Sequence, residues 1–266
     1  MLNRSGDEER TMDVRVYSRA PEDAQHHSLK LSVLLHLLPG AFATVAYFIL
    51  APVGERLGAP SFLMLLLAAV LFALPFELGC LLREGKRKNS KFSFKGVVAF
   101  HESLSAWQYV VLSLPLLVWM AFVAAVINPP IESAIVDSLF SWVPSVYFFG
   151  SFADHISDYS RATLIISALC LVILNGVVGP IVEELYFRGY LLPRISQLRG
   201  WAPLFNTVLF SIYHFFSPWQ NPLRILAFTP VFYVVWWKKN IFIGIIVHCL
   251  ANLLGSAAVL ILIIRS

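Results

Sequence analysis

Two adjacent carboxylates and an arginine, Glu183, Glu184 and Arg188, stand inside an apolar stretch of the chain. A charged side chain in hydrocarbon costs about 2.5–3.5 kcal/mol on insertion scales, so such groups pair, line a wet cavity or carry out chemistry. On a helix, Glu184 and Arg188 stand four residues apart and are expected to form an ion pair. Glu183 is rotated by about 100° from Glu184, which leaves it free to face a different partner.

Two later apolar stretches carry histidines. The first contains Phe210 and His214, and the second contains His248 and Asn252, which share one helix face because they are four residues apart. A single histidine in an apolar segment is most often a core residue. Three polar sites on three segments instead favour a shared cavity.

The three sites are predicted to lie at one depth. At 1.5 Å per residue, Glu183, His214 and His248 lie roughly 13, 16 and 10 Å below the same membrane surface. Polar groups at a common depth, open toward the cytosolic side, predict a water-filled cavity.

This set of side chains suits the hydrolysis of an amide. Glutamate and histidine together can take a proton from water, and a histidine with an asparagine can donate hydrogen bonds to an oxyanion. Spacing places no serine or cysteine beside them, which disfavours a covalent nucleophile. We expect no cofactor, although Glu183, His214 and His248 could instead bind zinc. The His-Glu-x-x-His helix typical of zinc proteases is absent from the sequence.

The composition indicates an integral membrane protein. Of 266 residues, 58% are hydrophobic and 14% are charged, whereas soluble domains have about 25% charged residues. The net charge of +4 does not indicate nucleic acid, because the basic residues cluster between apolar runs. Three cysteines, Cys80, Cys170 and Cys249, lie in apolar runs without metal or disulfide spacing, so we interpret them as buried small hydrophobic residues.

The elements that must position these groups are membrane helices. We predict an all-α, polytopic integral membrane protein with about seven transmembrane helices, in a range of about six to eight. We expect a polar cytosolic arm at 1–30 without a secretory signal, membrane helices and loops at 31–160, and a catalytic helix bundle at 161–266. The expected spans are Leu31–Pro52, Ser61–Leu82, Trp107–Ile127, a long segment Arg161–Leu192, Pro203–Ser217, Leu223–Trp237 and Ile241–Ile264.

Prolines and one carboxylate refine these spans. Asn128-Pro129-Pro130 is predicted to end the third span, with residues 131–161 forming an interfacial segment that includes at most a short or partial span. Gly176, Gly179 and Pro180 predict a kink before the glutamates, and a complete break would place them at a positive helix end. Glu77 is interpreted as an interfacial carboxylate, with a place on the cavity wall as the alternative.

The basic loops predict the orientation. The arm, the Arg83–Lys95 loop, the Arg188–Arg199 region and Lys238-Lys239 carry most of the lysine and arginine. The positive-inside rule then puts the N-terminus in the cytosol and the C-terminus outside. The Arg83–Lys95 loop is expected to touch anionic lipid headgroups.

The ordered motifs Glu-Glu-x-x-x-Arg, Phe-x-x-x-His and His-x-x-x-Asn resemble those of the CPBP family, the CAAX proteases and bacteriocin-processing proteins, also called the ABI family. Phe187-Arg188-Gly189 fits as well, and the resemblance covers roughly residues 165–260. It implies an α-helical intramembrane endopeptidase. In it, Glu183 and His214 would activate water, and His248 and Asn252 would form an oxyanion hole. Glu184, Arg188 and Phe210 would be supporting residues.

The resemblance implies a lipid bilayer and a membrane-associated protein or peptide as partners, and we expect the cytoplasmic membrane of a prokaryote. Eukaryotic members trim prenylated C-terminal tripeptides, but prokaryotic members also have other substrates, so prenylation is not carried over. One alternative is a catalytically silent scaffold or immunity-type partner, which is expected to lack a motif residue. Another is a transporter or channel, which is expected to show an internal repeat.

Overall fold

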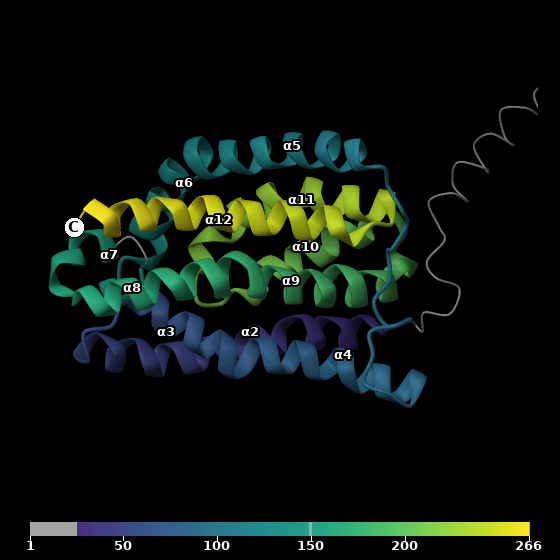
Figure 1. Cartoon of the computed structure of the whole chain (residues 1–266), viewed down its shortest axis with the longest axis horizontal. Coiled ribbons are helices and arrows are strands. Elements are labelled where there is room, and N and C mark those ends of the chain that lie inside the picture. Colours follow the sequence, from purple (N-terminus) through teal and green to yellow (C-terminus); the bar gives the residue numbers. More distant parts are fainter. Residues whose placement is uncertain (1–25, 149–150, 266) are drawn as a thin grey trace, which may run out of the picture.

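The protein is a bundle of helices (Figure 1), seen in a computed structural model that describes residues 26–148 and 151–265. Within these ranges every regular element is a helix. Five stretches of the described chain are long and apolar enough to cross a membrane: Leu29–Arg56, Ser61–Asn89, Ala106–Phe140, Arg161–Tyr213 and Ile241–Arg265. The predicted class, an all-α integral membrane protein, is confirmed. The predicted arm lies outside the described residues as far as residue 25.

Seven helical rods form in the described ranges, one for each predicted span. They are α2 (Leu29–Arg56), α3 with α4 (Ser61–Ala68, Leu74–Asn89), α5 with α6 (Ala106–Phe122, Asn128–Ile135), α8 with α9 (Arg161–Cys170, Gly179–Glu183), α10 (Ala202–Tyr213), α11 (Asn221–Lys238) and α12 (Ile241–Arg265). The long Arg161–Tyr213 stretch contains two of them, because the backbone leaves helical geometry at Ile195 and Arg199.

The rods pack in layers (Figure 1). Helices α2, α3 and α4 form one edge of the bundle and α5 the opposite edge, with α8, α9, α10, α11 and α12 between them. Aromatic side chains from the middle rods fill the core, where Phe187, Phe210 and Phe232 are almost completely buried. Large apolar side chains on the outer faces, such as Val110, Leu114 and Val118 on α5, are exposed. Such a surface suits contact with lipid.

The prediction that Asn128-Pro129-Pro130 ends the third span is wrong. Val123–Ile127 is a π-helical turn, after which the two prolines occupy the first turn of α6 and the helical stretch continues to Phe140. The Asn128 N–H donates five residues back, to the Val123 carbonyl, so the hydrogen-bond ladder is already shifted where the two prolines, which have no N–H, enter the helix. Of the predicted interfacial segment, residues 131–140 are therefore helical, and short turns with α7 (Ser151–Asp154) follow.

The helix that carries the glutamates is likewise not broken at Gly179 and Pro180. Leu171–Val178 is π-helical, Pro180 lies in the first turn of α9, and Glu184–Leu191 is π-helical again. Turns of this kind occur frequently at functional sites. Because the break is not complete, Glu183 and Glu184 lie inside a continuous rod rather than at a positive helix end.

The segments predicted to be cytosolic meet at one end of the bundle. The Ala99 N–H donates to the Gly189 carbonyl at 2.8 Å, and the Ile241 N–H donates to the Phe100 carbonyl at 2.8 Å. The His27 N–H donates to the Arg194 carbonyl at 2.9 Å. The chain before α2, the loop after α4 and the turn before α12 therefore share one face of the bundle.

This shared face gives a test of the predicted orientation. The predicted Arg83–Lys95 loop is helical as far as Asn89, where α4 ends. Single cysteines placed at 90–95, in the loop that follows, in a protein with Cys80, Cys170 and Cys249 replaced by alanine, should resist a membrane-impermeant maleimide in intact cells. They should react after the membrane is opened. A cysteine in 155–158, near the other end of the bundle, is the control and should react in intact cells. The reverse pattern would mean that the predicted cavity opens to the compartment outside the cytosol.

Candidate active site

The buried ion pair predicted between Glu184 and Arg188 is confirmed. The Arg188 Nε lies 3.2 Å from the Glu184 Oε2, and both side chains are fully buried. The guanidinium also lies over the rings of Phe232 and Phe210, at 3.7 and 4.1 Å from their centroids. Cation–π contacts of this kind are stronger in a desolvated site. Carboxylate and aromatic faces together hold the arginine charge inside the bundle.

His248 joins this pair from α12. Its Nδ1 lies 2.9 Å from the Glu184 Oε1 and donates to that carboxylate, which only accepts when ionised. A side chain at Gly244, one turn earlier on α12, would collide with the Glu184 carboxylate. Gly244 therefore makes room for a buried charge, and Glu184 fixes the ring orientation of His248.

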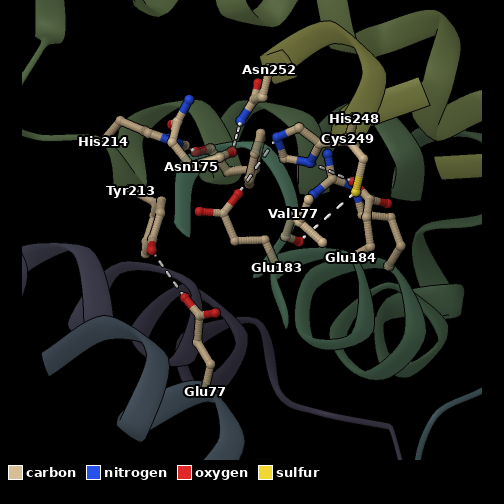
Figure 2. Close-up of polar contacts among 12 residues, drawn as sticks. Glu77, Asn175, Val177, Glu183, Glu184, Tyr213, His214, His248, Cys249 and Asn252 are labelled. Carbon is tan, nitrogen blue, oxygen red and sulfur yellow. Dashed lines mark hydrogen bonds and ion pairs between the residues drawn. The ribbon is translucent and has the colours of Figure 1, made fainter. Parts of the chain in front are cut away.

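Glu183 points away from this pair, as its rotation on the helix predicts. It borders a cavity of about 430 Å³ between α3, α9, α10 and α12. Its side chain is 16% exposed, whereas that of Glu184 is fully buried. Figure 2 shows its carboxylate facing the space that His214, His248 and Asn252 also border. The Glu183 Oε2 lies 3.8 Å from the His248 Nε2, which is too long for a hydrogen bond.

His214 lies just beyond the end of α10, so the prediction that this span runs to Ser217 is wrong. Its backbone has φ −82° and ψ 55°, outside the helical region. Pro218 disfavours helical geometry at Ser217. The His214 Nδ1 donates to the Phe210 carbonyl at 2.8 Å. In a neutral ring this leaves Nε2 as a proton acceptor, and the side chain lines the same cavity.

Asn252 completes the predicted set from α12. Its Nδ2 donates to the Asn175 carbonyl at 2.9 Å, within the π-helical stretch of the glutamate helix. This bond orients the amide and uses one of its two N–H groups. All four residues predicted to be catalytic therefore border one cavity, and Phe210 of the supporting set also lines it.

The alternative zinc set is not assembled in this conformation. Among residues 26–148 and 151–265, no three His, Cys, Asp or Glu side chains lie together in a way that could hold a metal ion. The direct acid–base reading needs no such cluster.

Two residues at or near the site, Glu77 and Arg224, belong to none of the three motifs. Glu77 is fully buried rather than interfacial, and its Oε1 accepts a hydrogen bond from the Tyr213 hydroxyl at 3.0 Å. It does not line the cavity itself. Arg224 does line the cavity, and its guanidinium donates to the Ser217 Oγ at 2.8 Å and the Asn221 Oδ1 at 2.9 Å. Arg224 thereby clamps the turn that follows His214.

Comparison with known proteins supports the motif reading. Residues 164–254 match the family described as type II CAAX prenyl endopeptidase Rce1-like. Over 93 residues the chain is 38% identical to the UPF0177 protein YxdF of Lactococcus lactis subsp. lactis (strain IL1403). That alignment covers 34% of this chain and 51% of the relative, so the chain spans about half the length of the curated relative it matches. No solved structure matches the chain.

The matched segment contains all three motifs, from Glu183 to Asn252. The predicted resemblance to the CAAX proteases is therefore confirmed for this part of the chain, since the Rce1-like family model matches residues 164–254.

Proposed function

We propose that the protein is an intramembrane endopeptidase that hydrolyses a peptide bond of a membrane-associated protein or peptide. The observation that carries this proposal is the cavity itself. A carboxylate (Glu183), an imidazole whose Nε2 can accept a proton (His214) and an amide donor (Asn252) border the same space inside a membrane bundle.

In the proposed reaction, Glu183 and His214 hold a water molecule and take its proton as the oxygen attacks the substrate carbonyl. The resulting oxyanion accepts hydrogen bonds from Asn252 and His248. In this role His248 carries a proton on both nitrogens, because its Nδ1 already donates to Glu184 and only Nε2 faces the cavity. The proton taken from water then passes to the leaving amine as the peptide bond breaks.

The proposed setting is the cytoplasmic membrane of a prokaryote with the N-terminus in the cytosol. Support comes from the lysine and arginine bias of the loops and from the bacterial relative. The matched family is named for CAAX prenyl endopeptidase activity. For this chain we propose a membrane-associated peptide substrate without assigning a prenyl group.

The decisive experiment is to incubate the purified protein in lipid nanodiscs with a panel of membrane-associated peptides and to identify new termini by mass spectrometry. Asn252→Ala is expected to lower kcat by about 10²–10³, the usual cost of one oxyanion donor. KM should change less, because the bond matters mainly in the transition state. Cys249→Ala, on the same helix but outside the cavity, is the matched control.

The same assay with a chelator separates the two mechanisms. We expect hydrolysis to persist in the chelator, with no stoichiometric metal in the purified protein. If the chelator abolishes hydrolysis and zinc restores it, Glu183, His214 and His248 are ligands instead. A wild-type protein that hydrolyses no peptide in the panel would favour the silent scaffold.

A further inference from the structure

Glu77 carries a carboxyl group inside a membrane-spanning rod, and it belongs to none of the three motifs. It lies on α4, is fully buried, and is joined to Tyr213 across 136 positions of sequence. Its second oxygen has no hydrogen-bond partner among the described residues. Burying such a group is costly, and polar groups inside a membrane protein are by default candidates for function.

Tyr213 places this carboxyl next to the site. It is the last residue of α10, and its ring lies edge-on to that of His214, with centroids 4.8 Å apart and an interplanar angle of 89°. The ring also packs against Phe187 at 5.0 Å and lines the cavity. Figure 2 shows the hydroxyl directed away from His214 toward Glu77.

His214 depends on such neighbours because it is not part of a helix. Arg224 holds the turn that follows it, and the His214 Nδ1 donates to the Phe210 carbonyl. The Tyr213 ring packs edge-on against the imidazole. A swing of the Tyr213 ring about its Cα–Cβ bond would carry the hydroxyl away from Glu77, whereas rotation about the Cβ–Cγ axis leaves the hydroxyl in place. The orientation of the imidazole is therefore coupled to a hydrogen bond made on the far side of the tyrosine.

We infer that Glu77 is a positioning residue for His214, acting through Tyr213. By accepting the Tyr213 hydroxyl, Glu77 fixes the ring that keeps the His214 Nε2 directed into the cavity. This inference rests on the proposed function, because it assigns Glu77 a part in the activation of water. A plain tether between α4 and α10 would stabilise the fold without affecting the turnover of the folded protein.

Kinetics of four variants separate these readings. Tyr213→Phe and Glu77→Leu should each lower kcat by about 10–100-fold with little change in KM, because a displaced catalytic group loses about that much. The double variant should lose no more than either single one, since both remove the same contact. Glu77→Gln keeps an acceptor oxygen and should retain most of the activity.

Tyr186→Phe is the matched control. It removes a buried tyrosine hydroxyl that donates to the Leu35 carbonyl at 2.9 Å, again between two rods, but away from the cavity. Its thermal stability should fall about as far as that of Tyr213→Phe, while its kcat stays at the wild-type level. An equal loss of kcat in both variants would mean that Glu77 only tethers α4 to α10.

A readout independent of turnover keeps this inference distinct from the proposed function. In protein labelled with ¹⁵N-histidine, the His214 resonances, assigned with His214→Gln, should move or broaden in Tyr213→Phe and Glu77→Leu. They should stay in place in Glu77→Gln and Tyr186→Phe. Unmoved resonances in a folded Tyr213→Phe protein would overturn the inference. If wild type hydrolyses no peptide yet the resonances move as expected, only the proposed function fails.

Discussion

Glu183→Gln is expected to lower kcat by about 10²–10⁴-fold, the usual contribution of a general base, while the protein still folds. Glutamine keeps the shape of the side chain but cannot take a proton from water. Stability should be retained, because Glu183 is partly exposed to the cavity and its nearest charged neighbour, the His248 Nε2, is 3.8 Å away. Turnover is measured on a peptide found by the cleavage assay, and folding by thermal unfolding in detergent.

Glu132→Gln is the matched control for this change. Glu132 is also a carboxylate on a membrane-region helix, but it accepts hydrogen bonds from Asn128 and Gln220 and does not line the cavity. We expect it to retain wild-type kcat. If Glu183→Gln hydrolyses peptide as fast as wild type, both the direct and the zinc versions of the mechanism are wrong.

Arg188→Ala should lower the free energy of unfolding by about 3–5 kcal/mol, the typical cost of removing one partner of a buried ion pair. The change leaves the Glu184 carboxylate buried with His248 as its remaining charged contact and empties the space between Phe210 and Phe232. Activity should fall as well, because Glu184 orients His248. Thermal and denaturant unfolding in detergent, with folded yield, measure the effect.

Arg87→Ala provides the comparison for Arg188→Ala. Arg87 pairs with Glu84 three residues away at 2.6 Å, but its side chain is 64% exposed. Exposed ion pairs contribute little to stability, so this variant should unfold at the same temperature as the wild-type protein. Should Arg188→Ala also unfold at the wild-type temperature, the buried pair would not be what stabilises the motif helix.

The part of the site that the sequence predicts depends on short-range spacing. Glu184 and Arg188 pair because they are four residues apart on one helix, and Glu183 faces elsewhere because it is one residue out of phase with Glu184. The spans themselves follow from apolar runs of membrane length. These inferences need no knowledge of which rods are neighbours.

The rest depends on contacts between distant segments. The bond between Glu77 and Tyr213 and the one between His248 and Glu184 join residues 136 and 64 positions apart, and spacing carries no signal for either. Prolines also misled the assignment of helix ends. Pro129 comes just after a π-helical turn, which lets the helical stretch continue through the proline. Such a turn has no simple sequence signature.

The π-helical residues Leu171–Val178 have a consequence for which glutamate faces the cavity. Each residue of an α-helix rotates the chain by about 100°, which is also the angle between Glu183 and Glu184. Deleting one residue from this stretch would turn the following helix by about that step. Glu184, which now pairs with Arg188, would then face the cavity in place of Glu183. Which of the two glutamates faces the cavity is thus a property of helix register, since the two neighbouring side chains are chemically the same.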